Sequence, residues 1–149
     1  VVVPVVMFLK LELLTGTSSY VYAGLIIFTS ALWFARTDQE TEDHWFNGFP
    51  AAWNLAIPTF LILGTSESYV ILIIVLLSFL SLTKLKFPHL VKVEYLRPIT
   101  WTLAVIYFVA LTALSVQYPN GPDSAKPILV LFPLYIFGIS ILHSWKVRQ

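Results

Sequence analysis

Six apolar stretches with no charged residue in their interiors alternate with short polar segments along the chain. Charged residues make up only 11% of the 149 residues, whereas a water-soluble domain usually carries about 25%. The hydrophobic share is 58%, so lipid rather than water is expected around the outer surface. The pattern therefore predicts an all-α, polytopic transmembrane helix bundle that forms a single domain over residues 1–149. About six helices are expected, over Val1–Leu9, Tyr20–Ala35, Ala51–Leu63, Tyr69–Thr83, Ile99–Val116 and Pro127–Trp145.

The lengths of these stretches are uneven. A spanning helix needs about 20 residues, and Ile99–Val116 and Pro127–Trp145 come nearest to this length. Val1–Leu9 is far shorter and has no initiating methionine, which predicts a helix truncated at its start. The chain is accordingly expected to be the C-terminal part of a longer protein.

Basic residues predict the orientation of the bundle. With six crossings, one side receives seven Lys and Arg residues and the other receives only Lys10 and Lys126. The positive-inside rule places the richer side in the cytoplasm. If Ala51–Leu63 were re-entrant, the split would again be seven to two, so charge leaves five and six crossings both open. In the six-crossing arrangement the seven residues are Arg36, Lys84, Lys86, Lys92, Arg97, Lys146 and Arg148.

The longest polar segment joins carboxylates to aromatic rings within residues 34–54. One interpretation is a solvated acidic loop that leads into an interfacial aromatic belt. A second is a cation site, because carboxylates neutralise a cation and aromatic faces attract a quaternary ammonium group. A third is a site for a hard divalent cation, although no standard ligand spacing is present. The cation site would use Glu42, Asp43, Trp45, Phe46, Phe49 and Trp53, whereas the divalent-cation site would use the four carboxylates and one histidine of the segment, Asp38, Glu40, Glu42, Asp43 and His44.

A second polar segment, Lys84–Pro98, is basic. It is interpreted either as a loop near anionic headgroups or as a phosphate contact, for which Arg97 is the best candidate because its planar fork can grip a phosphate. Asn54 is the one strongly polar residue inside a short apolar stretch. The net charge of +1 provides no basic field for nucleic acid, and the lack of charge within the apolar stretches disfavours a transporter.

The sequence around these candidates resembles a known family. The segment T-E-D-H-W-F-N-G-F-P-A-A-W-N over residues 41–54 resembles the signature of bacterial phosphatidylcholine synthases, in which an acidic stretch leads into aromatic-x-G-F-P-x-x-W-N. F-A-R-T-D at residues 34–38, F-P-H-L-V-K-V at residues 87–93 and L-R-P at residues 96–98 also resemble the family. These enzymes belong to the CDP-alcohol phosphatidyltransferases, which carry a D-x2-D-G-x2-A-R-x8–9-G-x3-D-x3-D motif. No such pattern occurs in this chain, whose only A-R pair is Ala35-Arg36.

The resemblance implies an eight-helix protein that transfers a phosphatidyl group from CDP-diacylglycerol to choline and releases CMP. It also implies a divalent metal, Mn or Mg, held by the motif aspartates, so no catalytic residue, metal ligand or cofactor is assigned within this chain. The chain is expected to be an inactive part of such an enzyme in the bacterial inner membrane, with membrane lipids, CDP-diacylglycerol and choline as partners and a homodimer as the implied assembly. The alternative is a non-catalytic helix bundle that binds lipid or assists assembly. Substrate contacts are predicted for Glu42, Asp43, Trp45, Phe46, Phe49, Trp53, Asn54 and Arg97.

Overall fold

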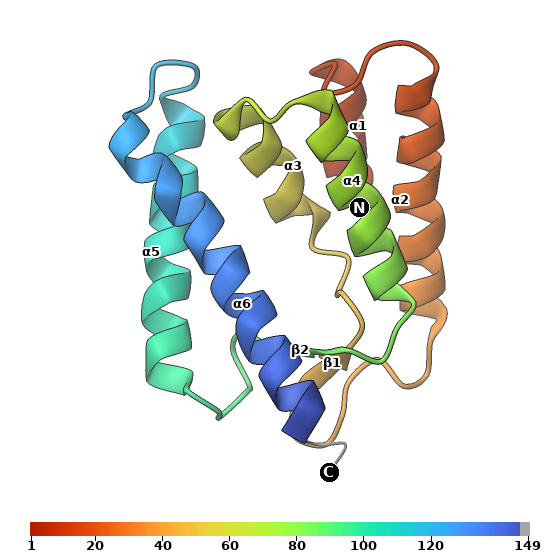
Figure 1. The fold of residues 1–149 in the computed structure, drawn as a ribbon, viewed down its shortest axis with the longest axis vertical. Helices are drawn as coiled ribbons and strands as arrows, with labels where there is room; N and C mark the ends of the chain where they lie inside the picture. Colours follow the sequence, from red (N-terminus) through yellow and green to blue (C-terminus); the bar gives the residue numbers. More distant parts are fainter. Residues whose placement is uncertain (147–149) are drawn as a thin grey trace.

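The computed structural model describes residues 1–146 and is mainly helical, which confirms the predicted all-α bundle. Each of the six predicted apolar stretches coincides with one helix (Figure 1). The helices are α1 (Val2–Lys10), α2 (Ser18–Ala35), α3 (Trp53–Leu63), α4 (Glu67–Ser81), α5 (Arg97–Val116) and α6 (Lys126–Lys146), and a short 3-10 turn, η1 (Asp123–Ala125), leads into α6.

Three of the helical segments are long and apolar enough to cross a membrane: α2, α5 and the segment Asp123–Lys146. The 20 residues of α5 correspond to about 30 Å of helix, which is the thickness of the hydrocarbon core of a bilayer. Helices α3 and α4 are shorter, with 11 and 15 residues. The chain nevertheless runs from one end of the bundle to the other through residues 48–63, which favours six crossings over a re-entrant segment (Figure 1).

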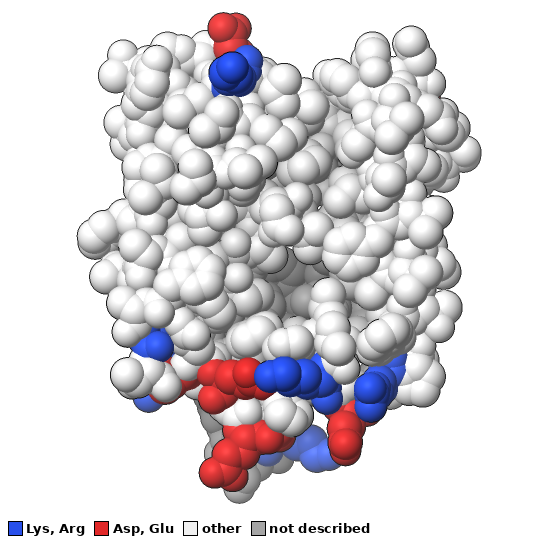
Figure 2. Space-filling model, turned by 180° about the vertical axis from the view of Figure 1, so that it is seen from behind, with Lys and Arg blue, Asp and Glu red and all other residues white. Residues whose placement is uncertain are grey.

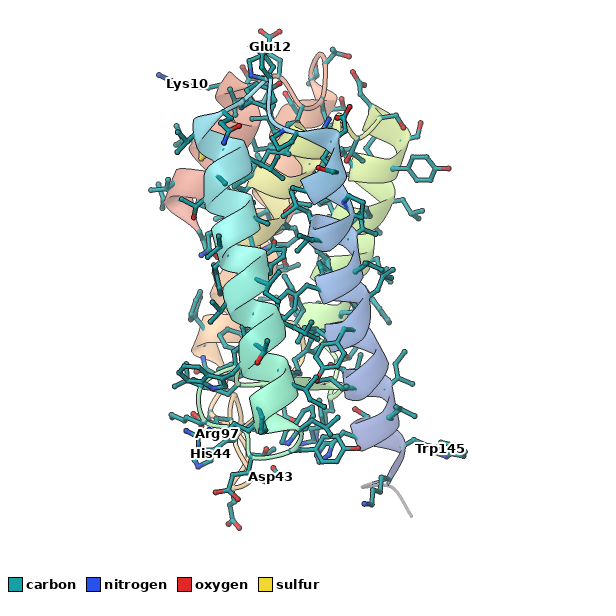
Figure 3. All side chains as sticks on the ribbon, turned by 90° about the vertical axis from the view of Figure 1, so that its left-hand side faces the viewer. Lys10, Glu12, Asp43, His44, Arg97 and Trp145 are labelled. Atoms are coloured by element: carbon teal, nitrogen blue, oxygen red, sulfur yellow. The ribbon has the colours of Figure 1, made fainter. Side chains whose placement is uncertain are left out.

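Charged residues gather at the two ends of the bundle. Lys10 and Glu12 mark one end, and Asp43 and Arg97 mark the other (Figure 3). On the face shown in Figure 2, no Lys, Arg, Asp or Glu lies between the two ends. Six of the seven basic residues predicted to share one side lie at the Arg97 end, while the seventh, Arg148, is outside the described residues.

Exposed aromatic side chains follow the same division. Tyr20 and Tyr69 lie at the Lys10 end of their helices and Tyr118 follows the end of α5 there, and their exposed fractions are 69%, 64% and 48%. Trp101 and Trp145 lie toward the opposite end, with exposed fractions of 44% and 65%. Two such belts are typical of the two interfaces of a bilayer, because these rings are apolar at one edge and polar at the other.

Apart from the short turn η1, the structure adds a small antiparallel sheet that the sequence pattern did not predict. Strands β1 (Trp45–Asn47) and β2 (Lys86–Pro88) pair at the charged end, with Phe46 opposite Phe87. This pairing brings the acidic and basic polar segments together. It confirms that residues 36–48 and 84–98 lie at the same end of the bundle.

Candidate functional site

The two polar segments form one structure, which we call the cap: residues 36–48 and 84–97. Asn47 lies at its centre. The buried side chain and the backbone of Asn47 together make four hydrogen bonds. Its Nδ2 donates to the carbonyl oxygen of Asp38 at 2.6 Å, and its Oδ1 accepts from Lys86 Nζ at 2.6 Å. Its backbone N–H donates to the Gln39 carbonyl at 2.9 Å, and its carbonyl accepts from Trp33 Nε1 at 3.0 Å. Asn47 therefore joins β1 to α2 and β2.

Arg36 fastens the cap to the end of α4. Its Nη1 donates to the carbonyl oxygens of Ser81 at 3.2 Å and Thr83 at 3.0 Å. The last carbonyls of a helix have no partner within the helix and carry partial negative charge, so a guanidinium is well suited to this position. Asp38 holds the other edge of the guanidinium through Nε at 2.9 Å and Nη2 at 3.1 Å. These hydrogen bonds lower the pKa of Asp38.

Gly48 allows the chain to pass close to the same helix end. Its N–H donates to the Leu85 carbonyl at 2.9 Å, and the following N–H of Phe49 donates to the Leu80 carbonyl at 3.2 Å. Gly48 has φ +85, and a Cβ at this position would lie 2.6 Å from the Ser81 carbonyl oxygen. Only glycine fits both the backbone angle and the close contact. The first residue of the G-F-P-x-x-W-N sequence therefore has a clear structural role.

Two carboxylates tie the acidic segment to distant parts of the chain. Glu40 accepts both bonds from Lys92 Nζ, at 3.0 and 3.1 Å, and contacts His44 Nδ1 at 2.8 Å. Asp43 Oδ2 lies 3.2 Å from His143 Nε2 on α6, and the His143 ring stacks on Trp45 with 3.8 Å between ring centroids. These contacts fix the acidic segment to both the basic segment and the last helix.

The same contacts shift the titration of the two carboxylates. Hydrogen bonds from His44 and then Lys92 lower the pKa of Glu40. For Asp43, partial burial acts to raise the pKa, but the hydrogen bond from Thr41 and the neighbouring backbone and His143 outweigh it, so the pKa is lowered.

We expect the cap to loosen in acid. A carboxyl group whose pKa is lower in the folded state contributes stability above its unfolded pKa, which is about 4.3 for Glu, and this contribution is lost as the pH falls through the folded pKa. The unfolding temperature should therefore fall between about pH 5 and pH 3. Glu40→Gln should flatten that part of the profile, as measured by tryptophan fluorescence in nanodiscs. Glu42→Gln is the matched control, since the Glu42 side chain makes no hydrogen bond within residues 1–146. Equal acid sensitivity of the wild-type and Glu40→Gln proteins would contradict this role.

The four predicted aromatic rings separate into different environments. Successive residues of a strand point to opposite faces, so Trp45 packs against His143 while Phe46 packs against Trp33. Phe49 and Trp53 lie together, with ring centroids 5.5 Å apart in an edge-to-face arrangement. The exposed fractions of Trp45, Phe49 and Trp53 are 1%, 9% and 0%. The rings therefore form no single cage in this arrangement, and their contact with a choline headgroup stays a prediction.

Besides Asp43, which is exposed but paired with His143, three of the predicted residues lie open to the surroundings. Glu42 and Arg97 are exposed on the cap, and Asn54 is exposed at the start of α3. No hydrogen bond of their side chains to another described residue is present. Residues 34–54 thus divide into a buried set that builds the cap and an exposed set that can meet a ligand.

The structure also reveals connecting residues that sequence reasoning missed. Asn47 and His143 were not predicted to have a role, and Arg36 was used only for orientation. The position of Arg36 and Asn47 could have drawn attention to them, because each residue lies within a segment that resembles the family. No sequence signal pairs His143 with Asp43, which is 100 residues away.

The described residues do not fit the divalent metal that the resemblance implies. Within residues 1–146, no group of three or more His, Asp or Glu side chains is arranged to hold a metal ion. Three of the carboxylates at this end are instead paired with cations or histidine: Asp38 with Arg36, Glu40 with Lys92, and Asp43 with His143.

Comparison with known proteins shows that the chain is similar to bacterial phosphatidylcholine synthases over most of its length. The enzyme of Rhizobium meliloti is 28% identical over 125 residues, which cover 83% of this chain and 52% of that protein. The enzyme of Borreliella burgdorferi is 27% identical over 149 residues, or 99% of this chain and 64% of that protein. The enzyme of Legionella bozemanae is 32% identical over 98 residues, or 62% of this chain and 45% of that protein.

The chain spans about half the length of the first curated relatives that it matches, at 50% and 52%. No protein-family model matches the chain. No solved structure matches it either. The resemblance seen at residues 41–54 is therefore confirmed by whole-sequence similarity, and the apolar helices together with these relatives identify a membrane protein.

Proposed function

We propose, from its similarity to bacterial phosphatidylcholine synthases, that this chain forms part of an enzyme that makes phosphatidylcholine from CDP-diacylglycerol and choline. The observation that carries the proposal is the sequence identity of 24–32% to eight proteins named phosphatidylcholine synthase. The matches extend over 60–99% of the chain. The placement of the cap supports it. A lipid-linked nucleotide and a water-soluble alcohol can meet only where the bilayer meets water, and the band of charged residues at the cap end of the apolar bundle is suited to such a boundary (Figure 2).

Within this proposal the cap has two parts. The buried residues, including Trp45 and Asn47, join the cap to the ends of α2 and α6. The exposed Arg97 is a candidate for the phosphates of CDP-diacylglycerol, because a guanidinium can bind a phosphate through two parallel hydrogen bonds. The exposed Glu42 is a candidate for the choline cation. The divalent metal belongs to aspartates of the D-x2-D-G-x2-A-R motif, which this sequence does not contain.

The first test concerns the chain by itself. We expect the purified 149-residue chain to form no phosphatidylcholine from CDP-diacylglycerol and choline with Mn or Mg present, because residues 1–146 provide no metal site of the required kind. Incorporation of radiolabelled choline into lipid and release of CMP are the measurements. Metal-dependent product from this chain alone would show that its own residues suffice and would contradict the assignment of the metal to the motif aspartates.

The same assay tests the proposed function directly. If the gene encodes the aspartate motif in frame before Val1, the longer protein should convert both substrates and release CMP in equal amount. A longer protein that contains the motif, inserts in the membrane and forms no phosphatidylcholine would contradict the proposal. It would favour the non-catalytic lipid-binding or assembly module.

The proposal also includes a location and an orientation. We place the protein in the bacterial inner membrane with the cap in the cytoplasm, because six of the eight Lys and Arg residues within residues 1–146 lie at that end. CDP-linked substrates are cytoplasmic in this scheme. A homodimer is part of the proposal by resemblance and can be tested by cross-linking in native membranes.

A further inference from the structure

One basic residue of the cap lacks the charged partner that comparable residues have. Three Lys and Arg residues in the described part of the chain are partly buried: Arg36, Lys86 and Lys126. Arg36 pairs with Asp38 at 2.9 Å, and Lys126 pairs with Asp123 at 2.6 Å. Within that part of the chain, no carboxylate forms an ion pair with Lys86. Its ammonium group is therefore partly removed from water without a negative charge beside it.

Neutral groups fix the position of this ammonium group. Lys86 and Asn47 lie opposite each other in the paired strands β2 and β1, and Lys86 Nζ donates to Asn47 Oδ1 at 2.6 Å. The orientation of the Asn47 amide is fixed in turn, because its Nδ2 donates to the Asp38 carbonyl oxygen at 2.6 Å. The backbone N–H of Lys86 donates to Ser144 Oγ of α6 at 2.7 Å. The fold thus holds a cation in place without neutralising it.

The carboxylates of the cap do not compensate this charge. Asp38, Glu40 and Asp43 are each paired with another basic group. A partly buried charge costs free energy unless an opposite charge and hydrogen bonds compensate it. An ammonium group has three N–H donors, and Lys86 uses one of them among residues 1–146. The remaining donors and the uncompensated charge are suited to an anionic ligand.

The surroundings of Lys86 indicate the kind of anion. Strand β2 lies at the charged end of the bundle, beside α6 (Figure 1). The next residue, Phe87, packs edge-to-face on Phe137 of α6, with 5.5 Å between ring centroids. Toward the same end of that helix, Trp145 is 65% exposed, as is typical of a residue at a bilayer interface. The anions concentrated at this level are lipid phosphates, which lysine binds as a point charge.

We propose that Lys86, held by Asn47, binds a phosphate group of a membrane lipid. The ligand class is a phosphate ester of diacylglycerol, and it has two sources. One is an anionic phospholipid of the bilayer, for which phosphatidylglycerol is the probe. The other is CDP-diacylglycerol, and this source alone rests on the proposed function.

Lysine labelling of the wild-type chain tests the site without any substitution. The chain is placed in nanodiscs of phosphatidylcholine alone, or with phosphatidylglycerol or CDP-diacylglycerol added, and is acylated with an uncharged amine reagent. Mass spectrometry gives the rate at each lysine. Acylation requires the neutral amine, whereas a bound phosphate favours the ammonium form and covers it. Lys84 is the internal control, because it is exposed on the same segment and carries the same charge.

We expect at least one of the two anionic lipids to slow the acylation of Lys86 roughly fivefold or more, and that of Lys84 by less than roughly twofold. Equal slowing at both lysines would be an effect of the surface charge of the bilayer and would overturn the proposal. Unchanged acylation of Lys86 with both lipids would mean that water alone solvates the ammonium group, and would overturn it as well.

A substitution tests the same site by affinity. Lys86→Gln should weaken the binding of the protecting lipid roughly tenfold or more, because a charge-assisted hydrogen bond is lost. Lys84→Gln removes the same charge from an exposed position and should weaken binding less than roughly fivefold. Native mass spectrometry in a neutral detergent gives both affinities. A loss for Lys86→Gln no larger than that for Lys84→Gln would reject a specific site.

The identity of the protecting lipid separates the two sources. Protection by phosphatidylglycerol would assign the site to anionic lipid of the bilayer, whatever reaction the longer protein catalyses. Protection by CDP-diacylglycerol alone would assign it to the phosphates of that lipid. The phosphatidylcholine assay decides the proposed function separately, so either proposal can fail without the other.

Discussion

Replacing Gly48 with alanine should lower the free energy of unfolding by roughly 2–4 kcal/mol. Two costs combine at this position. The left-handed backbone angle, φ +85, costs a side chain about 1–2 kcal/mol. The added Cβ would also lie 2.6 Å from the Ser81 carbonyl oxygen and 2.9 Å from that of Leu80, so β1 would have to move away from α4. The movement would break the bond from the Phe49 N–H to Leu80. Unfolding in mixed micelles, followed by circular dichroism, gives the measurement.

Gly64→Ala is the matched control for this prediction. Gly64 ends α3 with φ +59, but a Cβ there would have no atom within 4 Å. Gly64→Ala therefore has the cost of the backbone angle without a steric clash. Its free energy of unfolding should fall by about 1–2 kcal/mol. If the two variants lose equal stability, the close approach of β1 to α4 is not a determinant of the fold.

Trp53→Ala should be the other severe change and should lower the free energy of unfolding by about 3–5 kcal/mol. Trp53 is 0% exposed and packs edge-to-face on Phe49. Its Nε1 donates to Ser30 Oγ at 3.0 Å, and Ser30 Oγ donates in turn to the Ile26 carbonyl at 2.6 Å. Truncation leaves a cavity between α2 and α3 and removes the hydrogen bond that joins them. The measurement is the same unfolding experiment.

Trp145→Ala controls for the loss of an indole as such, because Trp145 is 65% exposed and should change the unfolding free energy by no more than about 0.5 kcal/mol. Trp53→Phe retains a buried ring and removes only the hydrogen bond, so we expect a loss of about 1 kcal/mol. This milder variant, made in an active longer protein, can test the predicted cation site. An increase in the Michaelis constant for choline without loss of stability would assign Trp53 to the substrate, whereas an unchanged constant would leave it as a packing residue. A loss for Trp53→Ala no larger than that for Trp145→Ala would show that the indole is not part of the core.

Much of the helical framework could be predicted from the sequence. Helix bounds followed the apolar stretches closely, as for Tyr20–Ala35 against α2, because the exclusion of charge from hydrocarbon acts on each residue separately. The shared location of the two polar segments followed from the six-crossing arrangement alone, since five crossings would have placed them on opposite sides. The resemblance at residues 41–54 pointed to the same enzymes that the whole sequence is similar to.

The arrangement of the site could not be predicted in the same way. Strands β1 and β2 have three residues each, too few for a periodic pattern. Their pairing sends Trp45 and Phe46 to opposite faces, so four rings that are close in sequence do not meet in space. The contacts of Glu40 with Lys92 and of Asp43 with His143 join residues 52 and 100 positions apart. Such pairs depend on how the helices pack, which no local pattern records.

The long sequence separation between the partners in the cap also determines when it can form during synthesis. Arg36 and Asn47 leave the ribosome well before the carbonyls of α4 and the side chain of Lys86 that they bind, and Asp43 precedes His143 by 100 residues. The pairing of Asp43 with His143 must therefore wait until the last helix has been inserted, whereas the bonds of Asp38 to Arg36 and of Glu40 to Lys92 join residues that precede α6. A nascent chain stopped before α6 should expose the stretch around Asp43 to protease on the cap side of the membrane, and a chain that includes α6 should protect it. Closure of the cap would thus report that membrane insertion of the whole bundle has finished.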